Sequence, residues 1–405
     1  MALRSASAVS ENEDSYEAGE ELARAILAKL ELQRRSIGIL YATMEFDFEK
    51  LLAGLKTHLD IPVIGCTTYS NITEAGYAEE SAVLLVLTSD SLEVGCGLGE
   101  GLSRDAEAAV AAACEAAQRG LQGPPRLIIT FPDVALTPSL SADTVLQSLS
   151  RRFPETPIVG GLPADGGQYK RTYQFFGARV CSDAIPVVLL GGDIHPIVAT
   201  RSGWVPTATK GHVTRSQEGH LCEIDGRPAI EYLKRYIADV DDPDILGSYP
   251  LAVYDPELSQ LSEKYSKYAV MRFAFRYDKE TGVVHYAVPI AEGAEVSLAR
   301  GSRDDAIAGL DEAARSIVGN TQGRGVSCVM VFSCAARKLL LGLQIDREIE
   351  ALKTHFSRRE EASDAADKVA ISGWYTYGEI GPIDSADEHL RKVRFHNATV
   401  VLCAL

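Results

Sequence analysis

Two polar residues in the last third of the chain have the types and positions for ligand chemistry. Arg337 follows an apolar run by a few residues, in Phe332-Ser-Cys-Ala-Ala-Arg337. A planar guanidinium at such a strand end can hold a carboxylate or phosphate through two parallel hydrogen bonds. Glu379 can accept a hydrogen bond from an amine. The alternative is structural, because Arg337 can instead pair with Glu379 or Asp384 inside the scaffold.

Cys334 in the same run is a candidate nucleophile. A thiol needs a nearby base to attack a substrate, and His396 is the one plausible donor in this part of the chain. No Asp or Asn has a spacing that suggests a third member, and a cysteine after an apolar strand usually fills a packing position. A hydrolase or transferase that uses Cys334 is therefore the enzymatic alternative to a binding protein.

Three apolar strands end in glycine-rich elbows, which must position these residues. The elbows lie in residues 61–70, 156–167 and 373–382. Glycine allows a sharp turn or the close approach of another group, although a tight turn packed by its own aromatics is the structural alternative. If the elbows converge, their ligand contacts join those of Cys334 and Arg337. The candidates in the elbows are Gly65, Cys66, Gly160, Gly161, Tyr375, Tyr377 and Glu379.

Each elbow belongs to a repeated order of strand, helix, strand, helix, elbow and strand. The copies begin near Ala6, near Leu92 and at the strand 295–300. A different segment, about 195–292, lies between the second and third copies and contains a predicted β pair at 268–277 and 283–290. The order predicts an α/β (α+β) protein with mixed or antiparallel sheets packed together and helices outside.

Composition limits the function classes. The chain has 405 residues and a formal net charge of −16, with no basic cluster, which argues against nucleic-acid binding. No apolar run approaches the roughly 20 residues of a membrane span, and the first residues lack a signal-peptide core. We therefore expect a cytoplasmic protein without membrane contact, whose eight cysteines are reduced.

Six motifs resemble those of the FIST family, a sensory domain of F-box proteins and bacterial signal transduction. The resemblance implies an N-terminal module over residues 1–194 and a C-terminal module over 195–405. It also implies small-ligand sensing without enzymatic activity, with output through a separate partner such as a histidine kinase or a cyclic-dinucleotide enzyme. The motifs are Ile64-Gly65-Cys66, Val159-Gly160-Gly161, Glu223-Ile-Asp225-Gly226-Arg-Pro228-Ala229, Phe332-Ser333-Cys334-Ala-Ala-Arg337, Tyr375-Thr376-Tyr377-Gly378-Glu379-Ile-Gly381-Pro382 and Phe395-His396-Asn397-Ala-Thr399.

One branch of the family resembles haem-based nitric oxide sensors, which makes haem a predicted cofactor. Haem needs one axial histidine and an apolar pocket. His212 and His220 are the candidates, because their even spacing places both on the same face of a strand. A sensor of amino acids or other small carboxylates without haem is the alternative ligand class.

Overall fold

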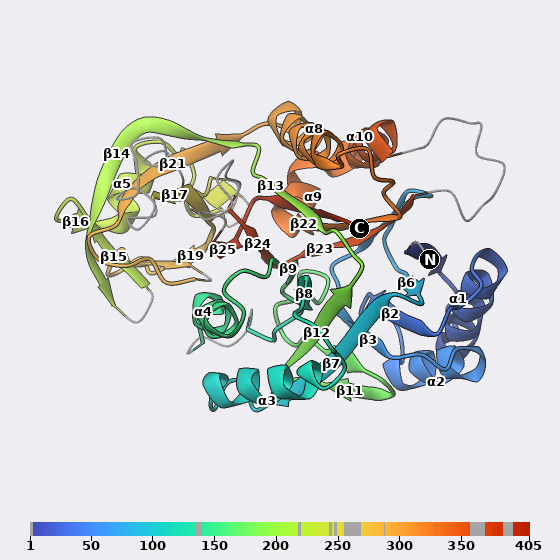
Figure 1. Ribbon diagram of the computed structural model, residues 1–405. Coiled ribbons are helices and arrows are strands. Elements are labelled where there is room, and N and C mark those ends of the chain that lie inside the picture. The colour runs from blue at the N-terminus through green and yellow to red at the C-terminus, as the bar shows by residue number, and fades with distance from the viewer. Residues whose placement is uncertain are drawn as a thin grey trace.

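The chain forms four sheets with helices on their outer faces (Figure 1). The computed structural model describes residues 3–134, 140–217, 220–242, 245–246, 249–254, 269–286, 288–356, 369–383 and 392–405. Three sheets contain both parallel and antiparallel pairs, and the fourth is antiparallel. The predicted α/β class, with mixed sheets and outer helices, is confirmed.

The first two copies of the repeat follow the predicted order. Each helix begins where an Asp or Ser side chain accepts a hydrogen bond from a backbone amide of the first turn, as Asp14, Asp47, Asp105 and Ser141 do. The first copy contains β1 (Arg4–Ser10), α1 (Ser15–Lys29), β2 (Arg35–Ala42), α2 (Phe48–His58), β3 (Val63–Thr67), β4 (Asn71–Thr73), β5 (Tyr77–Ala78) and β6 (Ala82–Ser89). The second contains β7 (Leu92–Glu100), α3 (Ala106–Gln118), β8 (Leu127–Thr130), α4 (Ala142–Arg152), β9 (Ile158–Gly161), β10 (Gln174–Phe176), β11 (Arg179–Cys181) and β12 (Ala184–Gly192).

The third copy begins elsewhere than the sequence predicts. Its first strand is β13 (Ile197–Arg201), which pairs with the last strand of the chain. The predicted strand, β21 (Glu295–Gly301), belongs to the antiparallel sheet instead. The prediction was wrong because β21 is followed directly by a helix, which is the feature that marks the first strand in the other two copies. The copy continues with α8 (Arg303–Asn320), β22 (Cys328–Cys334), α9 (Ala335–Leu341), η1 (Gly342–Gln344), α10 (Asp346–Phe356), β23 (Ala370–Thr376), β24 (Glu379–Pro382), β25 (Val393–His396) and β26 (Val400–Ala404).

The distinct middle segment is therefore an insertion within the third copy, between β13 and α8. It builds the antiparallel sheet that extends to the left in Figure 1. The predicted β pair is confirmed by the antiparallel pairing of β19 with β20. The insertion contains β14 (Trp204–Gln217), β15 (His220–Ile224), β16 (Arg227–Pro228), α5 (Ala229–Lys234), β17 (Leu251–Tyr254), β18 (Ala269–Arg272), β19 (Ala274–Tyr277), β20 (Val284–Tyr286) and β21.

The three copies exchange hairpins in a ring. Their own strands have the same order, β1-β6-β2-β3, β7-β12-β8-β9 and β13-β26-β22-β23. Each sheet is then completed by a hairpin of another copy. β10–β11 joins β3, β24–β25 joins β9, and β4–β5 joins β23. No copy completes its own sheet, so the copies form one interdependent unit.

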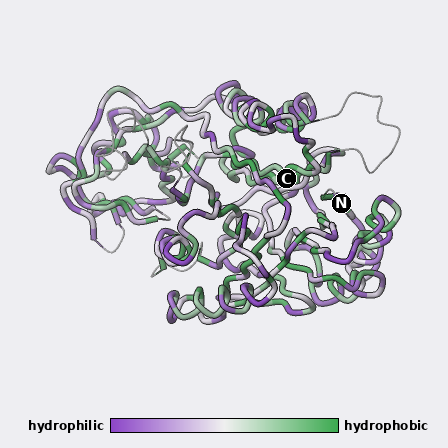
Figure 2. Tube along the Cα trace, in the orientation of Figure 1, coloured by the Kyte–Doolittle hydropathy of each residue, from purple (hydrophilic) through white to green (hydrophobic). Residues whose placement is uncertain are grey.

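The three sheets of the repeat share one apolar core and carry their helices outside, while the sheet of the insertion has a core of its own. The inner faces of the three sheets contribute Tyr41, Phe131, Phe332 and Trp374 to the shared core. The outer faces pack against α1 and α2, against α3 and α4, and against α8 and α10. Hydrophobic and hydrophilic residues alternate along these helices in Figure 2, as expected for helices with one buried face.

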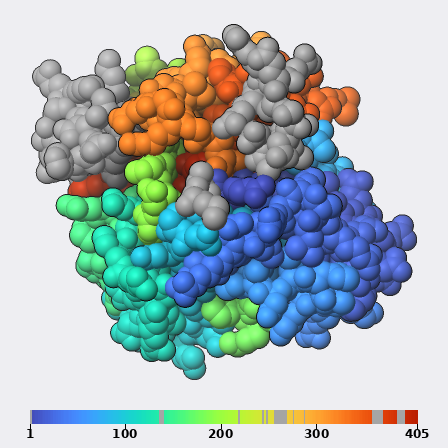
Figure 3. Space-filling view, turned by 45° about the vertical axis from the view of Figure 1, so that its right-hand side comes forward, coloured from blue at the N-terminus to red at the C-terminus, as the bar shows by residue number. Residues whose placement is uncertain are grey.

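The third copy meets the first two across a visible face of the molecule. In Figure 3 the first two copies, blue to green, form the lower part of this face, and the orange third copy forms the upper part. The helices in the described ranges include none with the length and apolar character needed to cross a bilayer.

Candidate functional site at the elbow junction

The three elbows occupy equivalent positions in the exchanged sheets. The first residue of each added hairpin pairs with the elbow strand of another copy: Asn71 with Trp374, Gln174 with Cys66, and Glu379 with Gly161. All three hairpin residues are polar and have no exposed surface. Each copy therefore supplies one buried polar side chain, at the point where its hairpin pairs with the elbow strand of another copy.

Backbone hydrogen bonds join the elbows directly. Tyr375 N donates to Ser70 O at 2.9 Å, and Tyr69 N donates to Tyr375 O at 3.1 Å. Leu162 N donates to Gly378 O at 2.8 Å, while Ala164 N donates to Thr67 O at 2.9 Å. The elbows converge as the sequence predicts. We call residues 65–71, 160–167 and 374–379 the elbow junction.

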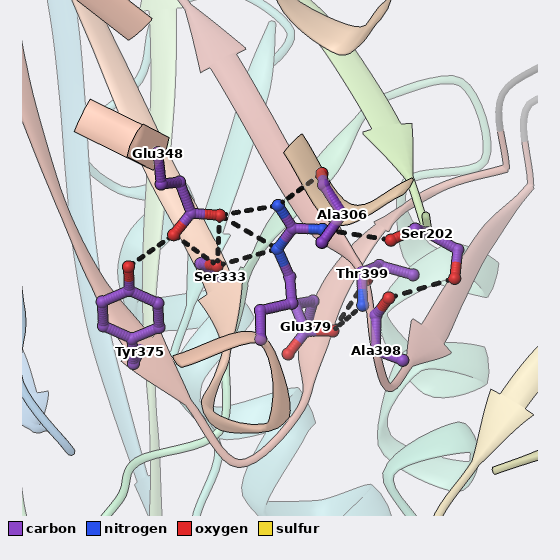
Figure 4. A network of polar contacts seen from close by, with 9 residues as sticks. Ser202, Ala306, Ser333, Glu348, Tyr375, Glu379, Ala398 and Thr399 are labelled. Carbon is purple, nitrogen blue, oxygen red and sulfur yellow. Dashed lines mark hydrogen bonds and ion pairs between the residues drawn. The ribbon is translucent and has the colours of Figure 1, made fainter. Parts of the chain in front are cut away.

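Arg337 is held by the protein itself, through hydrogen bonds to Glu348, Ser202 and Ala306, which are labelled in Figure 4. Its guanidinium donates to Glu348 Oε1 at 2.7 and 3.0 Å, and both side chains are completely buried. It also donates to the carbonyl oxygens of Ser202 at 3.1 Å and Ala306 at 3.0 Å. The second oxygen of Glu348 accepts a hydrogen bond from the Tyr375 hydroxyl. The network links the turn after β13, α8, α10 and the third elbow.

The partner of Arg337 differs from the one that the structural alternative named. That alternative paired Arg337 with Glu379 or Asp384; Glu379 bonds elsewhere, and Asp384 lies outside the described residues. A ligand carboxylate would have to displace the fully buried Glu348 to reach the guanidinium. Tyr375, the predicted ligand contact, is likewise buried and bound to Glu348.

Cys334 and Glu379 form a second buried cluster. Glu379 accepts hydrogen bonds from the Cys334 thiol, from Thr376 Oγ1 at 3.1 Å, and from Thr399 N at 3.1 Å and Oγ1 at 2.7 Å. Burial raises the pKa of Glu379 to about 8 against the lowering effect of these bonds. Burial also raises the pKa of the Cys334 thiol well above its ordinary value. The thiol is therefore protonated at neutral pH.

His396 does not have the character of a base for Cys334. Burial lowers the pKa of its imidazole to about 4, and Nε2 shares a hydrogen bond with Gly381 O at 3.1 Å. The group that contacts the Cys334 thiol is Glu379. The Cys334–His396 arrangement of the enzymatic alternative therefore receives no support from these contacts.

Tyr377 anchors a tyrosine stack at the junction. Its hydroxyl donates to Asp165, which also accepts hydrogen bonds from the backbone amides of Tyr169 at 2.8 Å and Lys170 at 2.6 Å. Burial alone would raise the pKa of Asp165, but these bonds outweigh burial and lower it. Tyr169, which is 64% exposed as a whole residue, stacks its ring on that of Tyr377 with centroids 4.5 Å apart.

Lys338 is a functional candidate that the sequence did not reveal. Its ammonium lies 4.3 Å from the centre of the Tyr69 ring and 5.5 Å from that of Tyr77. It pairs with Glu79 at 3.1 Å, and the side chains of Lys338 and Glu79 are 14% and 67% exposed. In the sequence, the only sign of a role for Lys338 was its position directly after Arg337. Which of these two adjacent cations faces the elbows depends on how α9 packs.

The predicted elbow glycines serve close packing. A Cβ at Gly65 would lie 1.8 Å from Leu40 O, and one at Gly161 would lie 2.7 Å from Thr376 Cγ2. Gly160 has a φ of +148° and would place a Cβ 1.9 Å from Thr130 O. Cys66 is fully buried in the shared core, and burial raises the pKa of its thiol well above the ordinary value.

The two haem candidates do not lie on one strand. His212 is in β14 and His220 in β15, two strands that pair antiparallel, so the even spacing does not place them on the same face of a single strand. The His212 side chain is 65% exposed, with its ring nitrogens 3.9 Å from Asp225 and 4.0 Å from Glu295. The His220 ring lies against His285, with centroids 4.2 Å apart. Neither environment fits an axial imidazole facing an apolar haem pocket, so we derive no step through haem.

Two shallow hollows lie away from the junction. One, of about 400 Å³, lies between α2 and Ala178. The other, of about 450 Å³, lies between β13, the start of β14 and α8. Within the described ranges, no three His, Cys, Asp or Glu side chains come together as a metal site.

Comparisons with known proteins find two modules of one family in this chain. The FIST N domain model matches residues 36–227 and the FIST C domain model residues 229–382. The matched ranges meet near residue 228, whereas the motifs placed the module boundary at 194. The chain is 22% identical to the uncharacterized protein MJ1623 of Methanocaldococcus jannaschii, over 95% of this chain and 75% of that protein.

Similarity to solved structures is low. A cyanuric acid hydrolase from A. caulinodans superposes with a TM-score of 0.33 and 10% identity, over 100% of this chain and 99% of that one. PurLQS from Thermotoga maritima gives a TM-score of 0.20 and 10% identity, over 100% and 72%. FIST domains are sensory and signal-transduction domains that bind small ligands. With both of its modules matched over most of the sequence, the chain belongs to the FIST family.

Proposed function

We propose that this protein is a sensor that binds a small carboxylate at the elbow junction and reports to a separate signalling protein. The observation that carries the proposal is the Lys338 ammonium, which lies over the Tyr69 ring and pairs with the exposed Glu79. A ligand carboxylate can take the place of Glu79, because the Glu79 side chain is 67% exposed and is solvated by water once it leaves the ammonium. Arg337, with its buried partner, offers no such exchange.

The tyrosines beside Lys338 supply the apolar part of the site. Tyr69 is half-buried, and its ring lies near the backbone of Gly167, two residues before the exposed Tyr169. Aromatic rings give a small ligand a large contact area at little conformational cost. A carboxylate on Lys338 with its carbon skeleton against Tyr69 uses both kinds of contact.

The junction is also where a bound ligand can influence the whole fold. Its backbone bonds connect all three copies, and Tyr375 extends them to Arg337 and the turn after β13. A ligand shifts such a structure only by its differential affinity for two arrangements. The family resemblance predicts a partner such as a histidine kinase. This partner would bind the two arrangements differently and so respond to the ligand.

Calorimetry with L-amino acids and small monocarboxylates, each beside its neutral amide, tests the proposal. We expect carboxylates to bind and their amides to bind at least tenfold more weakly, since the amide loses the charge-assisted bond to Lys338. Lys338→Gln should abolish this difference. Lys50→Gln, at a surface pair on α2, is the matched control and should retain it. Equal affinity of wild type and Lys338→Gln for a bound carboxylate would reject the site.

Haem-based detection of nitric oxide stays a separate prediction from the family resemblance. Titration of the purified protein with hemin, with and without nitric oxide, tests it through the Soret band. A band that shifts with nitric oxide and disappears in His220→Ala or His212→Ala would establish it. Protein that gains no band would leave the carboxylate sensor as the remaining proposal.

A further inference from the structure

Comparing Glu379 with the equivalent residues of the other two copies shows whether the fold needs a carboxyl group at this position. Its equivalent in the first copy, Asn71, donates to Ser81 O at 2.9 Å and Ser81 Oγ at 3.0 Å, and accepts from Thr68 Oγ1 at 3.1 Å. Thr68 and Ser81 precede a hairpin and a closing strand, as Thr376 and Thr399 do in the third copy. The equivalent in the second copy, Gln174, is again a neutral amide. In the first copy, a neutral side chain is therefore sufficient to tie the elbow to its neighbours.

The carboxyl group of Glu379 has no cation to balance it among its described contacts. Among the described residues, its hydrogen-bond donors are a thiol, two hydroxyls and one backbone amide, all neutral. His396, directly opposite on β25, is neutral because its pKa is low. The nearby guanidiniums are committed elsewhere, Arg337 to Glu348 and Arg272 to Phe395 O and Asp143. A fully buried carboxyl group in neutral surroundings favours the protonated acid.

We propose that Glu379 is a proton-binding group of the elbow junction, and that it takes up a proton when an anion binds beside it. The second half rests on the proposed carboxylate site. Cys334, which contacts Glu379, is the N-cap of α9, and Lys338 lies in the first turn and a half of this helix, so α9 connects the buried carboxyl group to the proposed anion site. An anion on Lys338 and an ionised Glu379 would repel one another across a poorly solvated region. Protonation removes the repulsion.

The surrounding groups can accommodate either state of Glu379. When ionised, the carboxylate accepts all the bonds described above. When protonated, it donates to the hydroxyl of Thr376 or Thr399, since a hydroxyl can both accept and donate. Burial supports the protonated form near neutral pH, with a pKa of about 8. Carboxylate affinity should accordingly fall as the pH rises through this range, approaching tenfold per pH unit above it.

The proton-binding half is tested without any ligand. The folded-state pKa of Glu379 lies above its ordinary value of 4.5, so the folded protein retains the proton to higher pH than the unfolded chain. Its contribution to stability is complete below pH 4.5 and is lost as the pH rises to about 8. The melting temperature of Glu379→Gln should therefore rise relative to wild type between pH 5 and pH 8. Glu350→Gln, on the exposed face of α10, should track wild type throughout.

Parallel pH profiles of wild type and Glu379→Gln would overturn the assignment. If Glu379→Gln does not fold, infrared spectroscopy of wild type replaces it. The C=O stretch of a buried protonated carboxyl group should then be present at pH 6.5 and decrease towards pH 9. Absence of such a pH-dependent band would also overturn the assignment.

The linkage half uses calorimetry of one bound carboxylate at pH 8 in phosphate and in Tris, whose ionisation enthalpies differ. Wild type should take up a fraction of a proton on binding, and Glu379→Gln should take up none. If no carboxylate binds, the proposed function and the linkage fail together, while the ligand-free experiment still decides the proton site. If carboxylates bind through Lys338 without proton uptake, only the linkage fails.

Discussion

Replacing Arg337 by lysine tests whether the buried network is scaffold. Lysine keeps a positive charge opposite Glu348, but its compact ammonium cannot also reach the carbonyl oxygens of Ser202 and Ala306, which the planar guanidinium spans. Each buried carbonyl left without a donor costs about 1–3 kcal/mol. For the two carbonyls together, we therefore expect Arg337→Lys to lower the free energy of unfolding by about 2–6 kcal/mol.

Removing the charge should cost more. Arg337→Met leaves Glu348 as an uncompensated buried carboxylate, which costs about 3–5 kcal/mol beyond the lost carbonyl contacts. Combining it with Glu348→Gln removes that penalty, so the double variant should be more stable than the sum of the single effects predicts. The coupling should be a few kcal/mol, because both side chains are completely buried.

Urea unfolding at pH 7 without ligand, followed by circular dichroism and fluorescence, measures these differences. Arg347→Lys is the matched control, since this arginine pairs with Asp304 at the surface and its replacement should change stability by under about 0.5 kcal/mol. Wild-type stability of Arg337→Lys, or additive effects of Arg337→Met and Glu348→Gln, would refute the scaffold role. An arginine that serves a ligand would instead leave the ligand-free protein unaffected.

Three further predictions concern packing, reactivity and assembly. Gly378→Ala would place a Cβ 2.1 Å from the Phe395 ring and should destabilise by about 1–3 kcal/mol in thermal melts, whereas Gly319→Ala, with open space in α8, should be neutral or stabilising. Cys334, only 4% exposed and with a raised thiol pKa, should resist a thiol-reactive probe at pH 7 until the protein is unfolded; rapid selective labelling in the native state would revive the enzymatic alternative. A chain divided after residue 194 should require co-expression of both parts, because each lacks a hairpin that the other supplies; two separately folded monomers would contradict the ring of exchanged hairpins.

The sequence alone was sufficient for the repeated order of elements in the first two copies. Helix starts such as those after Asp14 and Asp47 depend on a side chain that caps its own backbone, and this signal is local. Apolar periodicity and the elbow glycines likewise act within a few residues. The motifs around Cys334 and Tyr375 were sufficient for the family, because they preserve a specific order of residue types.

The tertiary structure decided which elements complete one another. Hairpins β4–β5, β10–β11 and β24–β25 each have an edge that could join any sheet of similar length, and only long-range packing selects a different copy. The same limit explains why β21 was mistaken for β13, since both are apolar strands and only pairing with β26 distinguishes them.

The roles of adjacent cations were also decided by the fold. The sequence gives no reason to assign different roles to Arg337 and Lys338. In the fold, α9 buries Arg337 against Glu348 and places Lys338 over the Tyr69 ring. The sequence predicts a ligand site at the elbows. Which side chain there is bound by the protein and which is open to exchange depends on burial, which arises only when distant segments pack together.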